Sequence, residues 1–543
     1  MLSDEMLLGV SKPARYTGGE WNSVVKGDGG IECRVALCFP DLYEVGMSHL
    51  GLKILYSVLN GRGDVACERS FAPWHDMEQL MRGKGIPLFS LETKRPLGEF
   101  DMLGFSLQYE LSYTNILNML DLSGIPLFSK DRDVSHPLIV GGGPCAFNPE
   151  PLADFFDCFV IGEAEEAILE VVDAIVKNKR SAVRRAELLE RLSEIEGVYV
   201  PSIPKAVKKR FIADLESAPF PDRPVVPFIN IIHDRIQVEI MRGCGRACNF
   251  CQACAIYRPN RFRSPAKILS MAEAIYKNTG YDEISLVSLS SGDHPQIMEI
   301  IRSLTGAFKD RAVGISFPSL RVEEMTSRFP LELTSGRHTG LTFAPEVGSE
   351  KMRKVINKDI PAESLKECAY QAFKNNWRRI KLYFMIGLPQ EEYDDLDAIV
   401  GLAREISEVK RRVDGRPAEI NAAISVFIPK PHTRFEREAM LPVDEVCRRQ
   451  KYIRDARRGM IKFIFHDARM SYLEAAFARG DRELSKVLYI AWKNGCRFDS
   501  WKECFDLEKW LSAFRDASLE PDHYALRSRG PGEALPWEFI SLR

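Results

Sequence analysis

Four of the thirteen cysteines fall within eleven residues, at Cys244, Cys248, Cys251 and Cys254. They directly follow a predicted strand at residues 237–241, where a barrel presents its active-site loops. Soft thiolates at this spacing hold zinc or an iron–sulfur cluster. Zinc is the weaker interpretation, because zinc sites usually come as two separated pairs and the sequence has neither a separate second CxxC pair nor an HxxxH partner.

The number of cysteines that bind such a cluster decides its chemistry. Three thiolates, from Cys244, Cys248 and Cys251, leave one iron of a four-iron cluster open, and an open iron can chelate an amine and a carboxylate. Cys254 extends the two-residue spacing into that of a ferredoxin run. If Cys254 were a fourth ligand, the cluster could only pass electrons. The residues leave a non-catalytic iron–sulfur electron-transfer protein as an alternative.

The first part of the chain predicts a parallel, doubly wound, Rossmann-like sheet, because β-rich runs alternate with helical stretches. The expected strands cover residues 34–39, 65–71, 102–107, 138–140 and 159–161. In this fold ligands bind at the carboxyl ends of the strands. Ser106 and the triplet Gly141, Gly142 and Gly143 stand at such ends, and glycines let a ligand approach the backbone closely.

A second α/β array follows a proline-rich linker that we expect to cross the surface between residues 200 and 227. Its expected strands cover residues 237–241, 283–289, 313–317, 340–343, 380–386 and 420–427, with helices such as Pro265–Asn278 and Tyr393–Val409 between them. Six such units predict an open, partial (β/α)6 TIM-like barrel. Strand signals disappear beyond Leu441, which predicts a helical C-terminal extension.

These patterns divide the 543 residues into five parts of an α/β protein. We expect an N-terminal arm at residues 1–32, a Rossmann-like domain at 33–180, a helix and linker at 181–230, a barrel core at 231–440 and the helical extension at 441–543.

Composition and charge exclude several classes of protein. The formal net charge of −2 gives no bulk field toward nucleic acid or anionic lipid, and 45% hydrophobic residues are typical of a globular chain. No apolar run approaches the 18 residues of a membrane span, and Asp4 and Glu5 stand where a secretory signal would be basic. We therefore expect a cytoplasmic protein without membrane contact.

The segment Cys244-Gly-Arg-Ala-Cys248-Asn-Phe250-Cys251 resembles the CxxxC-x-aromatic-C signature of radical S-adenosylmethionine (radical SAM) enzymes. It also follows the first strand of a partial barrel, as theirs does. The resemblance implies that Cys244, Cys248 and Cys251 are the metal ligands and that Phe250 belongs to the cofactor site.

Later segments resemble further parts of that family's cofactor site. Ser290, Ser291, Gly292 and Asp293, after the second strand, stand where the family has a Gly-Gly-Glu-like segment that contacts the methionine amino group, although their residue types depart from it. Glu346 resembles the polar residue that approaches the ribose or methionine moiety. Its alternative is an exposed glutamate that caps the helix beginning near Ser349.

The first domain resembles the cobalamin-binding-like domain that precedes the radical core in one large group of these enzymes. Ser106, Gly141–Gly143 and the stretch through Glu163-Ala-Glu165 carry this resemblance. The lower-ligand motif DxHxxG is absent, since His49 has the wrong spacing from Asp41 and Gly51. The resemblance therefore implies a corrin without a histidine ligand from this domain, or no corrin.

The resemblance implies a 4Fe-4S cluster, S-adenosylmethionine and, if the first domain binds a corrin, cobalamin as cofactors. One electron, from a donor such as flavodoxin or ferredoxin, would cleave S-adenosylmethionine and release a 5'-deoxyadenosyl radical that abstracts hydrogen from the substrate. With a corrin the expected outcome is methyl transfer to an unactivated carbon. The residues identify neither the substrate nor a further catalytic residue, and the chain looks like a member of an uncharacterised fusion subgroup.

One alternative function is a cobalamin-independent, methylthiotransferase-like modification of RNA or ribosomal protein. Its support is the basic stretch from Arg448 to Lys462, which could follow phosphates as a helix. Basic helix faces are usually only solvated, and neither interleaved aromatic residues nor a known RNA module accompanies this one.

Overall fold

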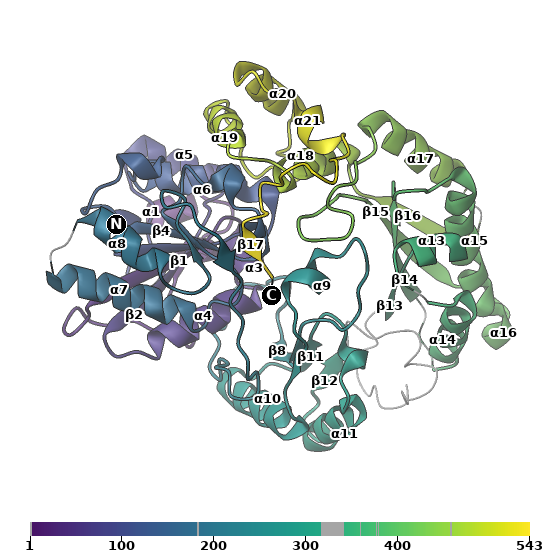
Figure 1. Ribbon diagram of the computed structural model, residues 1–543. Coiled ribbons are helices and arrows are strands. Elements are labelled where there is room, and N and C mark those ends of the chain that lie inside the picture. The colour runs from purple at the N-terminus through teal and green to yellow at the C-terminus, as the bar shows by residue number, and fades with distance from the viewer. Residues whose placement is uncertain are drawn as a thin grey trace.

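The computed structural model describes residues 3–181, 184–316, 341–358, 360–375, 377, 379–456 and 459–542. In Figure 1 the N-terminal α/β domain lies at the left, the sheets of the second α/β array lie below and at the right, and the C-terminal helices lie above. The short helices α1 (Asp4–Leu8), α2 (Ala14–Thr17) and α3 (Tyr43–Gly46) belong to the first of these parts.

The N-terminal domain contains a six-stranded sheet of order β2-β1-β3-β4-β5-β6. All neighbouring strands are parallel except β6, which is antiparallel to β5. The order of the first five strands is that of flavodoxin-like folds, whose ligands bind where the order reverses between β1 and β3. The strands are β1 Cys33–Phe39, β2 Val65–Phe71, β3 Met102–Ser106, β4 Leu138–Gly142, β5 Cys158–Val160 and β6 Val198–Tyr199.

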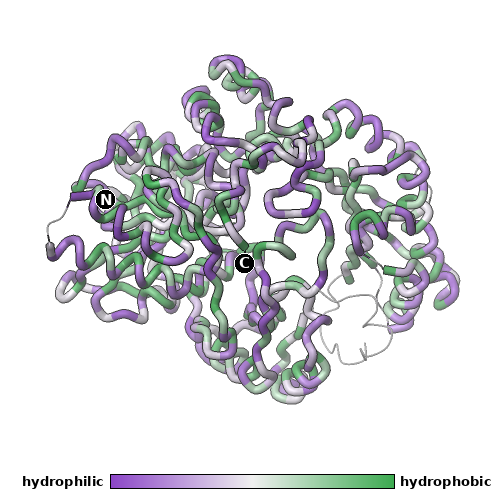
Figure 2. The backbone as a smooth tube through the Cα atoms, viewed as in Figure 1, coloured by the Kyte–Doolittle hydropathy of each residue, from purple (hydrophilic) through white to green (hydrophobic). Residues whose placement is uncertain are grey.

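Helices cover both faces of this sheet, so the predicted doubly wound domain is confirmed. In β1, Ala36 and Cys38 belong to the core beneath α5 and α6, whereas Val35 and Leu37 belong to the core beneath α4 and α7. Figure 2 shows hydrophobic strands inside this domain and more polar helices around them. The helices are α4 Leu50–Asn60, α5 His75–Lys84, α6 Tyr113–Leu122, α7 Ala167–Ser181 and α8 Arg185–Ser193.

The second array contains, within the described residues, seven parallel strands in two sheets of order β12-β11-β8 and β13-β14-β15-β16. The strands are β8 Ile236–Glu239, β11 Glu283–Val287, β12 Gly314–Ser316, β13 Leu341–Glu346, β14 Arg379–Ile386, β15 Glu419–Val426 and β16 Ile461–Phe465. The helices are α10 Pro265–Thr279, α11 Ile297–Phe308, α13 Glu350–Val355, α14 Ala362–Lys374, α15 Tyr393–Val409 and α16 Arg411–Asp414. A small antiparallel pair, β9 Met241–Arg242 and β10 Arg261–Phe262, flanks the helix α9 Gln252–Ile256.

The barrel core differs from the sequence prediction at its last strand. All six expected strands have a counterpart, although residues 317 and 340 at two of their ends lie outside the described residues. A seventh strand, β16, pairs with β15 in a region predicted to be wholly helical. The prediction missed this strand because the run Ile461-Lys-Phe-Ile-Phe465 is β-rich but short and directly follows a basic helix.

The C-terminal tail forms a strand pair with the linker between the domains. The strand β17 (Ile540–Ser541) pairs in parallel with β7 (Val207–Lys208), and the next linker residue, Lys209, is only 3% exposed. The expectation that the linker crosses the surface is therefore wrong at Val207 and Lys209, which are buried beside the tail, whereas Lys205 and Lys208 are exposed.

The C-terminal helices pack on the N-terminal domain. The Trp501 indole donates to the Asp41 carboxylate at 2.9 Å, and the Phe498 amide donates to the Asn115 side chain at 2.8 Å. These helices are α17 Val443–Asp455, α18 Ala468–Ala478, α19 Leu484–Lys493, α20 Leu507–Asp516 and α21 Pro521–Ala525. Within the described part of the chain, none of the helices is both long and apolar enough to span a bilayer.

Candidate active site

The four clustered cysteines lie together: Cys244, Cys248 and Cys251 stand on the loop between β9 and α9, and Cys254 is in α9 itself. Cys244 and Cys254 are buried, at 4% and 7% exposed, and Cys248 and Cys251 are half-buried. The Cys254 thiol lies within hydrogen-bonding reach of the other three sulfurs. Its hydrogen bond to Cys251 lowers the pKa of that thiol to about 7. The four sulfurs therefore converge on one place in the loop.

Local contacts fix the path of this cysteine loop. Gly243 has a φ of 89°, and a Cβ atom there would lie 2.7 Å from the carbonyl oxygens of Tyr257 and Pro259, so only glycine fits. Asn249 donates from its side chain to the Val355 carbonyl at 2.8 Å and from its backbone to the Ile356 carbonyl at 2.9 Å. The start of the loop at Gly243 thus packs against the residues that follow α9, and Asn249 ties the middle of the loop to the end of α13.

The chemistry of this donor set fits an iron–sulfur cluster. Thiolates are the protein ligands of such clusters, and four cysteine sulfurs meet here on a partly buried segment. Among the described residues, no three His, Cys, Asp or Glu side chains form a site for a single metal ion. This does not conflict with the cluster assignment, because the ligands of a four-iron cluster bind separate corners rather than one shared ion.

The segment after β11 reaches the cysteine loop. Ser290 and Ser291 are 2% and 0% exposed, and Ser291 begins a short 3-10 turn that includes Gly292. The next residue, Asp293, pairs with Arg246 of the cysteine loop at 3.1 Å. The structure thus brings the predicted Ser290–Asp293 segment to the cysteines, as the order of the strands implies.

Glu346 ends β13 in an unusual backbone conformation. Its φ is 66°, a left-handed value that is rare for a residue with a side chain and is typically kept at functional sites. Its carboxylate pairs with Lys358 at 2.7 Å, and both side chains are largely buried. The alternative that Glu346 is an exposed helix cap is wrong, because Ser349 caps α13 by accepting from the Met352 amide.

Phe250 packs into an apolar cluster beside the cysteines. It contacts a group of buried residues from the ends of β13, α13, β14 and β15, namely Val347, Met352, Ile356, Leu388, Phe427 and Phe435. Phe250 therefore holds the loop against the barrel mouth, where parallel strands end.

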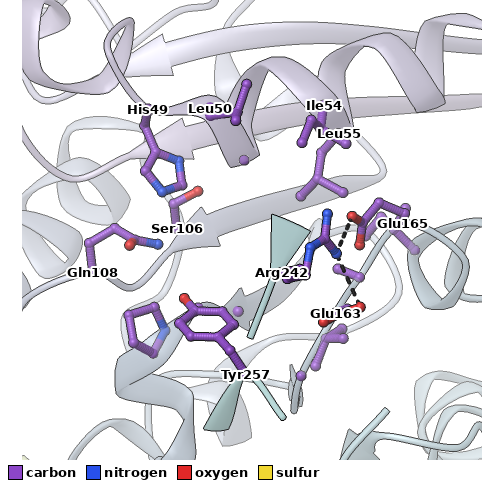
Figure 3. A pocket seen from close by; sticks show the side chains of 18 of the residues that line it. His49, Leu50, Ile54, Leu55, Ser106, Gln108, Glu163, Glu165, Arg242 and Tyr257 are labelled. Carbon is purple, nitrogen blue, oxygen red and sulfur yellow. Dashed lines mark ion pairs between the residues drawn. The ribbon is translucent and has the colours of Figure 1, made fainter. Parts of the chain in front are cut away.

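A cavity of about 380 Å³ lies between the N-terminal domain and the cysteine loop. The predicted residues Ser106, Gly141, Gly142 and Gly143 all line it, at the carboxyl ends of β3 and β4. Gly143 has a φ of 116°, and a Cβ atom there would lie 2.7 Å from the Leu107 carbonyl oxygen. In Figure 3, His49, Ser106 and Gln108 gather on one side of the pocket.

His49 lies on the wall of this cavity as a neutral imidazole. Burial lowers the pKa of His49 to about 4. Its Nδ1 accepts a hydrogen bond from the Leu52 amide at 3.1 Å, so the ring proton is on Nε2. In that tautomer Nε2 is a hydrogen-bond donor and has no lone pair for a metal.

Arg242 joins the two domains across the same cavity. Its guanidinium pairs with Glu165 at 2.8 Å and Glu163 at 3.1 Å, both from the N-terminal domain, and with Glu239 of β8 at 2.9 Å. Figure 3 shows Glu163 and Glu165 facing Arg242 on one side of the pocket. All four side chains are about nine-tenths buried. This network fixes a residue two positions before Cys244.

Among the residues of this cavity that sequence reasoning missed, Arg242 and Tyr257 are the two nearest to the cysteine loop that carry large polar side chains. Both flank the cysteine loop, one on each side, and Tyr257 lines the cavity beyond α9. Their proximity to the cysteines along the chain was the available signal. The partners of Arg242, Glu163 and Glu165, lie about 80 residues away in sequence, so this pairing could not be predicted from the sequence.

The basic stretch proposed for RNA is largely neutralised by ion pairs. Arg448 and Arg449 pair with Glu445 at 2.8 and 2.9 Å, and Lys451 pairs with Asp455. Arg457 and Arg458 lie outside the described residues. The described part of this helix therefore offers little free positive charge.

Two family models match the chain. The model described as "Radical SAM proteins, N-terminal" matches residues 51–201, and the model of the radical SAM superfamily matches residues 238–403. The second match spans the cysteine loop, the Ser290–Asp293 segment and Glu346.

Several proteins resemble the chain over much of its length. An uncharacterized protein of Methanocaldococcus jannaschii is 28% identical over 491 residues, which are 89% of this chain and 97% of that protein. The anaerobic magnesium-protoporphyrin IX monomethyl ester cyclase of Rubrivivax gelatinosus is 24% identical over 261 residues, 47% of this chain and 45% of that protein.

Two solved structures share the fold. The radical S-adenosylmethionine methyltransferase TsrM from Kitasatospora setae, with cobalamin and a [4Fe-4S] cluster bound, is 14% identical with a TM-score of 0.52, covering 76% of this chain and 78% of that chain. The cobalamin-dependent S-adenosylmethionine radical enzyme OxsB, with aqua-cobalamin bound, is 13% identical with a TM-score of 0.52, covering 89% of this chain and 71% of that chain.

The Arg242→Met variant tests the network between the domains. Removing the guanidinium leaves Glu165 buried without its cation, so we expect a loss of about 3–5 kcal/mol in the free energy of unfolding. Chemical denaturation measures this loss. The control Arg448→Met removes an exposed pair and should cost less than about 1 kcal/mol. Equal stability of the two variants would show that Arg242 carries no such role.

Proposed function

This chain is a radical SAM enzyme, and we propose that it cleaves S-adenosylmethionine reductively at a four-iron cluster held by Cys244, Cys248 and Cys251. The observation that carries this proposal is the meeting of two segments at the barrel mouth. The Arg246–Asp293 pair joins the cysteine loop after β8 to the Ser290–Asp293 segment after β11.

The residues around the cysteines would bind and orient S-adenosylmethionine. When bound, a cluster with one open iron supplies a chelation site and the electron for cleavage of the sulfur–carbon bond, and enzymes of this superfamily need an external electron donor. The buried hydroxyls of Ser290 and Ser291 offer hydrogen bonds to a methionine group. The Glu346 carboxylate can accept from an ammonium or a ribose hydroxyl. Phe250 and its apolar cluster exclude water from the same place.

The residues that line the cavity between the domains are of the chemical types that could bind the corrin of cobalamin. The cavity lies at the strand ends where flavodoxin-like folds bind ligands. At Gly142, which lines it, a Cβ atom would meet only the Val160 carbonyl oxygen at 3.8 Å, so the space beside this backbone is open. Polar side chains on one wall, His49, Ser106 and Gln108, can bond to amide groups such as those a corrin carries. TsrM and OxsB, which share the fold, have cobalamin bound. We infer that any corrin here lacks an imidazole ligand from His49.

Methyl transfer is the reaction class that this combination supports best. The cobalt of a bound corrin would carry the methyl group that is transferred. Arg242 and Tyr257 line the cavity and flank the cysteine loop, so the cavity lies directly beside that loop. The substrate would enter between the two sites, at the mouth of the barrel. The neutralised basic helix gives the RNA-modifying alternative no comparable support.

The Cys248→Ala variant tests the cluster assignment. We expect it to lose both the visible absorbance of the reconstituted cluster and at least about a hundredfold of S-adenosylmethionine cleavage, because an iron loses its thiolate. Cleavage is measured as 5'-deoxyadenosine. Cys254→Ala should keep both properties, and so should the control Cys158→Ala, which removes a buried thiol of β5. Loss of both properties in Cys254→Ala with retention in Cys248→Ala would overturn the proposal.

The cobalt(II) form of the reconstituted protein tests the role of His49. Because the Nε2 of His49 carries a proton, we expect its paramagnetic resonance spectrum to lack nitrogen splitting from a protein ligand. The spectrum of His49→Ala should then be the same. Nitrogen splitting that disappears in His49→Ala would show that the imidazole binds cobalt.

Glu346→Gln keeps the shape of the side chain and removes its charge. We expect about tenfold weaker S-adenosylmethionine binding by calorimetry, since charge-assisted hydrogen bonds are roughly twice as strong as neutral ones. Cluster content should remain nearly unchanged, whereas the melting temperature should fall, because Lys358 stays largely buried without its carboxylate partner. The control is Lys358→Met, which removes the partner of Glu346 but not the carboxylate. If both variants bound S-adenosylmethionine equally weakly, Glu346 would act only through its ion pair with Lys358.

A further inference from the structure

Cys254 has contacts that its position outside the CxxxC-x-aromatic-C signature does not explain. It belongs to α9, is 7% exposed, and its sulfur lies within hydrogen-bonding reach of Cys244, Cys248 and Cys251 at once. A cysteine that only filled the core would contact apolar side chains. This one faces the three sulfurs that we assign to the cluster.

The protein holds Cys254 in this position from outside the cysteine loop. The ammonium of the buried residue Lys209 donates to the carbonyl oxygens of Ile256 at 3.0 Å and Arg258 at 2.5 Å, at the end of α9. Lys209 is covered in turn by the strand pair β7–β17 from the C-terminal tail. The placement of the fourth thiol is therefore part of the tertiary structure.

Two requirements meet at this thiol. A permanently bound fourth cysteine would prevent the iron from chelating S-adenosylmethionine. A thiol so close to an open iron would nevertheless bind to it as long as no substrate is bound. We propose that Cys254 is an exchangeable fourth ligand, which closes the cluster in the substrate-free enzyme and is displaced by S-adenosylmethionine. This inference rests on the proposed function and extends it to the substrate-free state.

The exchange balances without a further reactant. The bond between iron and the Cys254 sulfur breaks, and bonds form from the same iron to the amino nitrogen and a carboxylate oxygen of S-adenosylmethionine. The proton that the ammonium group loses passes to the released sulfur. No electron is transferred, so the oxidation state of the cluster is unchanged.

Competition from Cys254 has a measurable consequence for substrate affinity. If only a fraction of the enzyme has an open iron, the apparent Kd for S-adenosylmethionine rises by the inverse of that fraction. Removing the competing thiol should therefore tighten binding. If the iron is open in about one molecule in ten, Cys254→Ala should bind S-adenosylmethionine about tenfold more tightly than the native enzyme does.

Mössbauer spectroscopy of enzyme reconstituted with iron-57 tests this inference. In the substrate-free native enzyme we expect four irons with similar, cysteine-bound parameters. In Cys254→Ala we expect one iron to differ already without substrate. S-adenosylmethionine should produce a distinct iron in the native enzyme and shift the existing one in the variant. Cys158→Ala is the matched control and should match the native enzyme in both states.

Identical substrate-free spectra of the native enzyme and Cys254→Ala would overturn the inference, as would equal affinity for S-adenosylmethionine. If Cys254→Ala fails to fold, Cys254→Ser keeps the volume with a much weaker ligand and should show the same distinct iron. Failure of the proposed function looks different, because S-adenosylmethionine would then change the spectrum of neither the native enzyme nor the variant.

Discussion

Arg242 is buried among three carboxylates, and this charge arrangement connects the two halves of the enzyme. Its guanidinium reaches Glu163 and Glu165 of the N-terminal domain from a position two residues before Cys244. Glu163 also pairs with Arg261 of β10 at 2.6 Å, on the other side of the cysteine loop. Breaking such pairs leaves buried charges without partners, which costs far more than losing surface pairs. The distance between the cavity and the cysteines is therefore fixed.

The C-terminal extension stabilises the same arrangement from the opposite side. Lys430, which follows β15, pairs with Glu110 of the N-terminal domain at 2.6 Å and with Glu474 of α18 at 2.9 Å. The last strand then returns to the linker and covers Lys209, whose ammonium holds the end of α9. Residues far apart in sequence thus position one loop, which explains why a region without recognisable motifs is an integral part of the fold.

Local patterns in the sequence predicted the elements well. The β-rich run at residues 34–39 and the helical segment Tyr393–Val409 identified a strand and a helix that the structure contains, and the cysteine spacing identified the loop. The strand β16 was missed because a short β-rich run after a basic helix carries a weak signal.

Contacts between distant segments could not be predicted in the same way. The resemblance to radical SAM enzymes placed Ser290–Asp293, which follows the second strand of the barrel, near the cysteines. It did not show that Arg246 pairs with Asp293, that Ser349 rather than Glu346 caps α13, or that Arg242 meets Glu163 and Glu165. Each of these depends on how packed elements approach, which local propensity does not determine.

We propose that one loop-and-cavity arrangement holds a cluster, S-adenosylmethionine and a corrin close together. Anaerobic reconstitution of the full chain with iron, sulfide, cobalamin and S-adenosylmethionine tests it most directly, followed by mass spectrometry of the products and of the corrin that remains bound after desalting. We predict 5'-deoxyadenosine together with stoichiometric corrin. Corrin retention without any cleavage of S-adenosylmethionine, or cleavage by a protein that retains no corrin, would contradict the claim.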